Sequence, residues 1–329
     1  MKAIRYHAYG SPEVLKLQDV DMPTVDDDEV LVRVRAASVN PLDWHNMRGT
    51  PYVVRVQAGL SRPKTAGLGG DMAGCVEAVG KNVTRFRPGD EVFGGRGRSL
   101  IERSASFAQY LSIHEDGMVV RKPGNLTFEQ AASVPVAALT ALQALRDKGQ
   151  LRPGQKVLIN GAAGGVGTFA VQIAKVLGAE VTGVCGTAKS EMVRSIGADH
   201  VIDHTKEDFT SDGRRYDLLI DLVGNRTPTE CRRVLATRGV LVGCAPAKGL
   251  WAGPLIGVLK LLVLSRAGSQ RMVPFLARES KNDLADLHGL LEAGKITPVV
   301  DRTFSLSEVP KAIAYLEEGH AAGKVVITI

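Results

Sequence analysis

The stretch Val157–Gly167, which reads VLINGAAGGVG, decides the fold of this chain. An apolar strand runs into a turn of small residues, and a helix with one apolar face follows at once. Small residues let the backbone approach a bulky anion, and the first N–H groups of the helix attract a pyrophosphate. This strand–turn–helix context predicts a dinucleotide site rather than a turn that only packs. The residues expected at the pyrophosphate are Ala163, Gly164, Gly165, Val166 and Gly167.

Around this stretch, segments typical of strands alternate with segments typical of helices. Strands are expected at 156–160, 180–185, 200–202, 216–222 and 239–244, and helices at 166–178, 188–196 and 228–236. Such alternation predicts an α/β domain with a parallel, doubly wound sheet. The preceding segment Phe128–Leu145 is rich in Ala and Leu and predicts a helix broken by Pro135.

The first 120 residues and the C-terminal end have a different pattern. Val30–Ala36 and Gly74–Gly80 are typical of short strands, and Arg87–Asp90 is typical of a turn. From residue 296 onward the strand pattern returns, and the apolar run Gly323–Ile329 predicts a strand docked in a sheet. These segments predict a second, β-rich domain with few long helices.

Composition is that of a globular enzyme. Of 329 residues, 44% are hydrophobic and 23% are charged. The net charge of +6 comes from scattered Lys and Arg, and aromatic residues make up 5%, so no nucleic-acid partner is expected. The apolar run 250–265 is shorter than the roughly 20 residues of a membrane span, and suits core or interface packing better than a membrane surface. The start, MKAIR, has no apolar signal region, so a cytoplasmic location is expected.

Six motifs carry a resemblance to a known family. They are Ser38–Trp44 (SVNPLDW), Gly70–Gly74 (GDMAG), Arg87–Val92 (RPGDEV), Ala163–Gly167 (AGGVG), Gly197–Asp203 (GADHVID) and Gly294–Pro298 (GKITP). Together they span nearly the whole chain, which resembles the zinc-independent quinone oxidoreductase-like branch of the medium-chain dehydrogenase/reductase superfamily. The resemblance implies a GroES-like catalytic and substrate domain at 1–125 and 275–329. It also implies an inserted Rossmann NADPH-binding domain at 126–274, and a homodimer.

The residues after strand 180–185 indicate which nucleotide is bound. An acidic residue there would bind a ribose 2′-hydroxyl and repel a 2′-phosphate. Here Gly186, Thr187 and Lys189 follow, offering a loop N–H, a hydroxyl and a cation that suit a phosphate. The sequence therefore predicts NADPH, the alternative being that Lys189 is only a solvated residue of the next helix. His204 stands where the family often has a Tyr beside the phosphate, and is either a phosphate donor or a surface histidine.

The same resemblance implies a set of residues beside the nicotinamide half of the cofactor. They are Thr140 in the expected helix, Leu222 and Val223 at the end of a strand, and Cys244 after the last strand of the alternating region.

The chain lacks the thiolates of metal-dependent relatives. Tetrahedral zinc sites use Cys and His ligands, and neither Ser38–Asp43 nor 91–110 holds a Cys. Asp71 stands where metal-dependent relatives carry a His. The cysteines, which include no C-x-x-C pair, are Cys75, Cys185, Cys231 and Cys244. We therefore expect no zinc, and the alternative is a thiolate-free site of Asp43, His45 and Asp71.

Without a metal ion to polarise an alcohol, an acceptor that is already electron-poor is favoured. A quinone or an α,β-unsaturated carbonyl (enone or alkenal) accepts hydride directly, and the resulting anion must be stabilised and protonated. The resemblance places Asn40 and Asp43 at the active-site cleft, with His45 and Tyr52 nearby. Asn40 would donate a hydrogen bond to a carbonyl or the nicotinamide ribose, and His45 or Tyr52 would supply the proton. The structural alternative is that Asn40 caps the turn before Pro41 and Asp43 holds a loop.

Three other functions remain open from the sequence. Two are enzymatic: a metal-free alcohol dehydrogenase-like activity, and reduction of an enoyl thioester, which needs an acyl channel near the apolar 255–264. The third is a nucleotide-binding interaction or RNA-binding protein with vestigial catalysis. Salt-sensitive RNA binding that competes with NADPH would support that third function.

Overall fold

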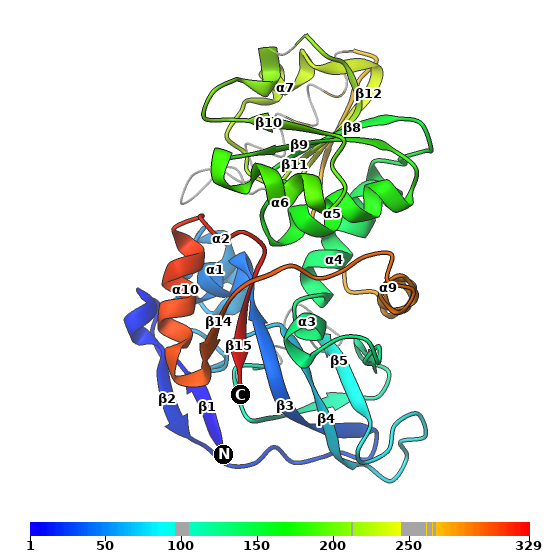
Figure 1. Cartoon of the computed structure of the whole chain (residues 1–329). Coiled ribbons are helices and arrows are strands. Elements are labelled where there is room, and N and C mark those ends of the chain that lie inside the picture. The colour runs from blue at the N-terminus through cyan, green and yellow to red at the C-terminus, as the bar shows by residue number, and fades with distance from the viewer. Residues whose placement is uncertain (96–104, 212, 245–260, 262–264, 266–267) are drawn as a thin grey trace. The chain divides into compact units, whose positions relative to one another are not determined.

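The chain forms two compact units in the computed structural model, which describes residues 1–95, 105–211, 213–244, 261, 265 and 268–329 (Figure 1). The terminal unit contains both chain ends and comprises Met1–Leu139, Glu279–Gly294 and Pro298–Ile329. The inserted unit comprises Thr140–Arg278 and Lys295–Thr297. The chain thus leaves the terminal unit, builds the inserted unit and returns.

The units divide at 139/140 and 278/279, later than the expected boundaries at 125/126 and 274/275. The reason is the helix α3 (Phe128–Ala132), which packs against the strands β3 (Glu29–Val39) and β4 (Asp71–Val79) of the terminal unit. The next helix, α4 (Pro135–Leu142), carries the chain across the boundary.

A six-stranded parallel sheet organises the inserted unit and confirms the predicted doubly wound fold. Its strands are β8 (Lys156–Asn160), β9 (Glu180–Cys185), β10 (His200–Asp203), β11 (Tyr216–Asp221), β12 (Leu235–Gly243) and β13 (Arg271–Pro274). Their order is β10-β9-β8-β11-β12-β13, so the winding reverses between β8 and β11. Ligands of such sheets bind beyond the carboxyl ends of the strands at this switch point.

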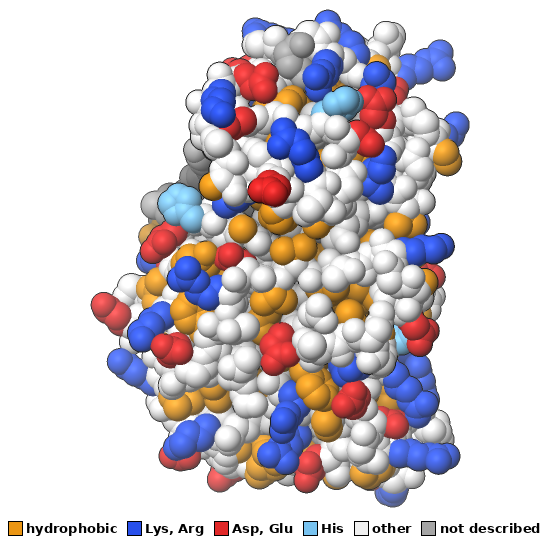
Figure 2. Space-filling view, in the orientation of Figure 1, with side chains coloured by type: hydrophobic (Ala, Val, Ile, Leu, Met, Phe, Trp, Pro, Cys, Tyr) orange, Lys and Arg blue, Asp and Glu red, His pale blue; other side chains and the backbone are white. Residues whose placement is uncertain are grey.

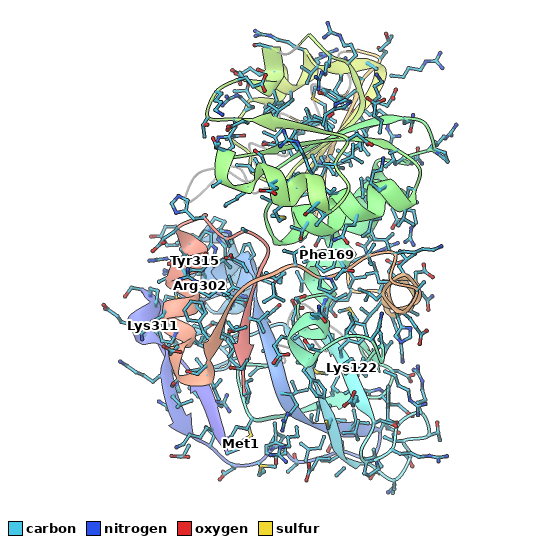
Figure 3. All side chains as sticks on the ribbon, viewed as in Figure 1. Met1, Lys122, Phe169, Arg302, Lys311 and Tyr315 are labelled. Atoms are coloured by element: carbon cyan, nitrogen blue, oxygen red, sulfur yellow. The ribbon has the colours of Figure 1, made fainter. Side chains whose placement is uncertain are left out.

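Helices cover both faces of this sheet. They are α5 (Gly165–Val176), α6 (Ser190–Ser195) and α7 (Pro228–Arg232). Figure 1 shows α5 and α6 on one face and α7 on the other. Phe169, labelled on α5 in Figure 3, is completely buried and anchors the helix that starts at the glycine-rich turn.

The terminal unit is β-rich, as predicted. A seven-stranded sheet has the order β14 (Val300–Ser305), β15 (Lys324–Thr328), β3, β4, β5 (Glu91–Gly95), β7 (Val119–Arg121), with β6 (Tyr110–His114) paired to β3. An antiparallel pair joins β1 (Lys2–Arg5) to β2 (Lys16–Asp19). The longer helices around the sheet are α1 (Pro41–Arg48), α2 (Val53–Ala58), α9 (Lys281–Glu292) and α10 (Val309–Glu317). The expected C-terminal strand is confirmed as β15, which lies between β14 and β3.

Several elements differ from the sequence prediction. The helix expected at 228–236 ends at Arg232, because the buried Leu235 already begins β12. The helix break expected at Pro135 lies before that residue, between α3 and α4. Pro135 itself begins α4, because proline is accommodated in the first turn of a helix. The C-terminal region also contains α10, whose buried Val309 and Ile313 have helical spacing.

The apolar run 250–265 lies outside the described residues except at 261 and 265, and so does most of the proposed acyl channel at 255–264. Among the helices in the described parts of the chain, none is long and apolar enough to cross a membrane.

Candidate functional site

The turn between β8 and α5 forms a cradle made of backbone. Gly161 has a φ of +89°, and a Cβ added at Gly167 would lie 2.1 Å from the Gly161 carbonyl oxygen. Glycine at 167 therefore lets the helix begin directly against the turn. The Thr168 N–H donates to the Gly164 carbonyl at 2.9 Å, which leaves the N–H groups of residues 165–167 without an acceptor inside the helix. Ala163 is buried, whereas the partly exposed residues at this helix start are Gly164, Gly165 and Val166.

Three polar side chains that the sequence did not single out meet at the carboxyl ends of β8 and β11. Asn160 Nδ2 donates to Asp221 Oδ1 and to Asn225 Oδ1, both at 2.9 Å. The same Asp221 oxygen accepts the N–H groups of Val223 at 3.1 Å and Gly224 at 2.9 Å. This buried carboxylate therefore closes the turn after β11 and ties it to β8 at the switch point. One sequence signal for this group was available: a polar residue, Asn160 or Asp221, ends each of the two apolar strands.

The residues expected at the adenosine phosphate gather beyond the carboxyl end of β9. Thr187 and Lys189 lie in a short 3₁₀ turn that directly follows Gly186. A Cβ added at Gly186 would lie 3.6 Å from His204 Nε2, so the histidine ring lies over this glycine. Thr187 and His204 are exposed and Lys189 is partly exposed, which makes the group accessible to a ligand.

Asp203 places a carboxylate beside the residues expected at the adenosine phosphate. The 3₁₀ turn that follows β9 contains no acidic residue and did not predict this carboxylate. It ends β10, opposite Cys185 of β9. Thr187 Oγ1 donates to Asp203 Oδ2 at 2.5 Å, and Thr205 Oγ1 donates to Asp203 Oδ1 at 2.7 Å. These hydroxyl donors hold the pKa of Asp203 well below its ordinary value. Lys206 Nζ lies 3.4 Å from the same carboxylate and balances part of its charge.

Leu222, Val223 and Cys244 lie together at the ends of β11 and β12. The Leu222 N–H donates to the Asn160 carbonyl at 3.1 Å, and the Cys244 N–H donates to the Asp221 carbonyl at 2.9 Å. Burial raises the pKa of the Cys244 thiol to about 12, and the nearby Asp221 adds to the effect, so the thiol is neutral at ordinary pH. Thr140 lies on α4, outside this group of strand ends.

In the terminal unit, sheet register brings distant residues together. β3 ends directly before Asn40, and β4 begins at Asp71, opposite Ser38 of β3. β15 begins at Lys324 and pairs with the end of β3. We call Ser38, Asn40, Asp71 and Lys324 the buried polar cluster, because none is more than 4% exposed.

Asp71 accepts three hydrogen bonds in the buried polar cluster. Its Oδ2 accepts hydrogen bonds from Ser38 Oγ and from Asn40 Nδ2, both at 2.8 Å. Its Oδ1 accepts the Val136 N–H, in the first turn of α4, at 3.1 Å. The carboxylate is thus hydrogen-bonded on both oxygens and lies at the N-terminus of α4.

Lys324 supplies the positive charge of the buried polar cluster. Its Nζ donates to Asn40 Oδ1 at 2.6 Å and to the Val39 carbonyl at 3.2 Å, and lies 3.6 Å from Asp71 Oδ2. Burial lowers the pKa of Lys324, while Asp71 and then Asp43 oppose that effect. The sequence did not single out this lysine, because it lies within the run Gly323–Ile329, which predicts only a strand.

Asp43 has the local role that the sequence allowed as an alternative. It is 2% exposed, and its Oδ2 accepts the Asn40 N–H at 2.7 Å, which holds the start of α1. The expected alternative metal set of Asp43, His45 and Asp71 is not assembled, because each side chain is bonded elsewhere. Within the described ranges, no group of three His, Cys, Asp or Glu side chains is arranged to hold a metal ion.

His45 and Tyr52 follow on the next turns of the chain. His45 Nδ1 lies 2.7 Å from the Thr50 carbonyl oxygen, and burial lowers the pKa of its ring. Tyr52 directly precedes α2, and the Arg55 guanidinium carbon lies 4.7 Å from its ring centroid. Asn40 and Asp43 are therefore in direct contact at the start of α1, and His45 lies on the same helix.

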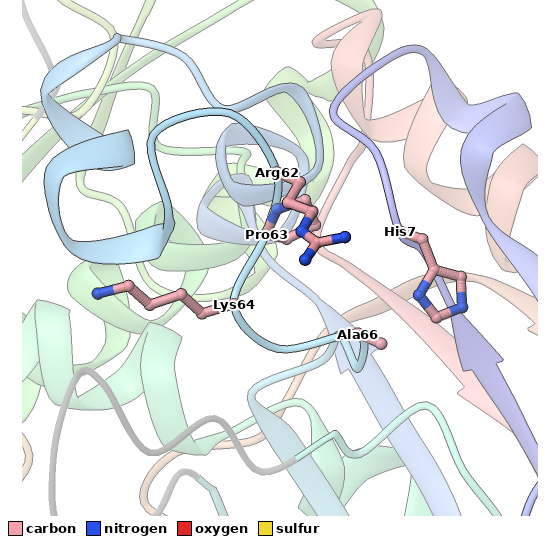
Figure 4. Close-up of a pocket in the computed structure, with 5 residues that line it drawn as sticks. All are labelled: His7, Arg62, Pro63, Lys64 and Ala66. Atoms are coloured by element: carbon pink, nitrogen blue, oxygen red, sulfur yellow. The ribbon is translucent and has the colours of Figure 1, made fainter.

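None of the expected site residues lines either of two surface cavities. A cavity of about 400 Å³ in the terminal unit is lined by His7, Arg62, Pro63, Lys64 and Ala66 (Figure 4). A cavity of about 320 Å³ in the inserted unit is lined by Arg194, Asp199, His200, Val201, Ile202, Glu207 and Arg214. On the face shown in Figure 2, Lys and Arg side chains are interspersed with Asp and Glu, as the scattered charges of the sequence predict.

Two family models match the chain. The model described as alcohol dehydrogenase GroES-like domain matches residues 26–124, within the terminal unit. The model described as zinc-binding dehydrogenase matches residues 196–327, which belong to both units.

Relatives and solved structures match over nearly the full length. Mitochondrial NAD(P)H oxidoreductase RTN4IP1 of Mus musculus is 37% identical, over 98% of this chain and 87% of the relative. Chloroplastic NADPH-dependent alkenal/one oxidoreductase of Arabidopsis thaliana is 34% identical, over 99% of this chain and 79% of the relative. The structure of the quinone oxidoreductase from Coxiella burnetii has a TM-score of 0.88 at 31% identity, and covers 100% of this chain and 99% of that one.

Proposed function

Because the chain belongs to the quinone oxidoreductase-like branch of the medium-chain dehydrogenase/reductase superfamily, we propose that it is an NADPH-dependent, zinc-independent reductase. The substrate is a quinone or an α,β-unsaturated carbonyl, an enone or alkenal. The observation that carries the proposal is the backbone cradle at the switch point of the inserted sheet. The activities named for the Arabidopsis thaliana and Coxiella burnetii proteins support the choice of acceptor.

The inserted unit fits a dinucleotide. The helix start at Gly164–Val166 is partly exposed and offers N–H donors to a pyrophosphate, while Gly167 keeps the helix against the turn. The bound cofactor supplies the hydride, and the protein supplies binding, orientation and exclusion of water. The bonds of Asn160 and Asp221 fix the strand ends that carry Leu222, Val223 and Cys244, the residues that we assign to the nicotinamide half.

Preference for NADPH belongs to the same proposal. Lys189, His204 and the backbone of Gly186 would hold the 2′-phosphate beyond the carboxyl end of β9. The Thr187 hydroxyl already donates to Asp203, so Thr187 contributes mainly by shaping the turn. The negative charge of Asp203 would repel the phosphate, and the nearby Lys206 ammonium would reduce that repulsion.

The terminal unit would bind the acceptor. Asn40 is the proposed hydrogen-bond donor to the acceptor, and Asp43 holds the backbone on which Asn40 sits. Burial lowers the pKa of His45 and so disfavours its charged form, which makes Tyr52 the preferred proton donor of the two. We also infer a homodimer in the cytoplasm, which gel filtration and cell fractionation test.

The test of the function is NADPH oxidation by the purified chain with a panel of quinones and enones. Turnover with at least one acceptor class, unchanged by a metal chelator, is the expected result. The Tyr52→Phe variant is expected to slow enone reduction by about 10² or more, the usual contribution of a positioned proton donor. Bound NADPH with no turnover across the whole panel would contradict the proposal.

A further inference from the structure

Lys324 is a buried cation whose shortest hydrogen bond goes to Asn40 rather than to the carboxylate of Asp71. Lysine is almost never fully buried without a partner, and this side chain is only 3% exposed. Its ammonium lies 2.6 Å from the amide oxygen of Asn40 but 3.6 Å from the carboxylate of Asp71. The geometry therefore favours Asn40 as the group that Lys324 primarily holds.

Asp71 does not need Lys324 to satisfy its oxygens. It already accepts hydrogen bonds from Ser38, Asn40 and the N–H of Val136. Burying a lysine beside such a carboxylate carries a desolvation cost, and a buried ion pair is weak evidence for stability alone. Some role other than satisfying Asp71 therefore accounts better for the ammonium.

The buried polar cluster fixes both ends of the Asn40 carboxamide. Its oxygen accepts from Lys324, and one N–H of its Nδ2 donates to Asp71 at 2.8 Å. A carboxamide nitrogen has two N–H donors. Within the described residues, the other meets only the Ser38 carbonyl, at 3.5 Å, which is a long hydrogen bond. The network thus determines the direction of one weakly engaged N–H donor.

We propose that Lys324 is a positioning residue for the reaction, acting through Asn40. Its ammonium prevents the carboxamide from flipping and aims the weakly engaged N–H at the oxygen of the acceptor. The proposal rests on the proposed function, because it concerns the same reduction of a carbonyl-bearing acceptor. It adds a residue from the last strand of the chain, 284 positions from Asn40, to the machinery for that reaction.

The test is a double-variant cycle on the full chain with the best quinone or enone acceptor. Lys324→Met, Asn40→Ala and the combined variant are compared for kcat, KM of the acceptor and Kd of NADPH by fluorescence. Lys311→Met is the matched control, because Lys311 is an exposed lysine of α10 (Figure 3). We expect Lys324→Met to lower kcat/KM by about 10- to 100-fold, the size of one charge-assisted hydrogen bond. NADPH affinity should stay within about twofold.

Non-additivity distinguishes positioning from structural support. If Lys324 acts through Asn40, the combined variant loses little more than Asn40→Ala alone. Wild-type kcat/KM in Lys324→Met, or fully additive losses, would overturn the proposal. If Lys324→Met does not fold, Lys324→Met/Asp71→Asn removes both charges, and the same loss of kcat/KM is expected. Failure of both to fold would make the cluster purely structural and overturn the inference. An inactive wild type that binds NADPH would instead refute the proposed function.

Discussion

The nucleotide cradle at Gly161–Gly167 and the buried polar cluster differ in what they are made of. The cradle is contiguous in the chain and depends on missing side chains, since a Cβ at Gly167 would lie 2.1 Å from a carbonyl oxygen. The cluster joins residues from 38 to 324 and depends on buried charges and on hydrogen bonds as short as 2.6 Å. A substitution that adds volume should therefore disrupt the cradle, and a substitution that removes a charge should disrupt the buried polar cluster.

The largest effect is expected from removing one charge of the cluster. Lys324→Met leaves Asp71 buried without a cation, and we expect the free energy of unfolding to fall by about 3–5 kcal/mol. Chemical denaturation measures this loss. Lys324→Met/Asp71→Asn should lose less than the single variant, because no unpaired charge remains buried. A single variant as stable as the wild type would show that charge does not sustain the cluster.

A smaller effect is expected from adding one methyl group to the cradle. Gly167→Ala forces the start of α5 away from Gly161, which we expect to cost about 1–3 kcal/mol of stability. NADPH binding should weaken at least about tenfold, because the helix N-terminus moves with its donors. Fluorescence titration measures the affinity. Gly289→Ala in α9 is the matched control, since its added Cβ would meet no atom within 4 Å, and it should bind normally.

The smallest effect concerns Asp203 and pH. The folded-state pKa of Asp203 lies below the unfolded value of about 3.9, so its ionised form stabilises the inserted unit above that pH. This contribution is lost as pH falls through the lower folded pKa. The Tm of Asp203→Asn should therefore lie slightly below that of the wild type at pH 7, and the difference should shrink toward pH 3. A Tm difference that does not change with pH would contradict the assigned pKa direction.

The contrast between the two regions explains what the sequence can predict. The cradle lies within eleven consecutive residues, so strand, turn and helix could be read directly from Val157–Gly167. The residues expected at the adenosine phosphate were partly predictable, because Gly186, Thr187 and Lys189 are close together in the sequence. Asp203 was missed because it reaches Thr187 only through the pairing of β10 with β9.

The buried polar cluster could not be assembled from the sequence. The family resemblance marks the neighbourhoods of Asn40 and Asp71, but the register of β3 with β4 and β15 decides which residues they contact. Lys324 is separated from both by most of the chain. By contrast, α10 was readable: Val309, Ala312, Ile313 and Leu316 have helical spacing that a strand interpretation of this region overlooked.

The central claim is that the inserted unit is an NADPH site whose phosphate end includes Lys189. Titration of the wild type and Lys189→Ala with NADPH and with NADH, followed by nicotinamide fluorescence, tests it most directly. Lys156→Ala is the control, because Lys156 is an exposed lysine at the opposite end of β8 from the cradle. We predict tighter NADPH than NADH binding by the wild type, and about tenfold loss for NADPH alone in Lys189→Ala. Equal affinity for both nucleotides, or no binding, would contradict the account.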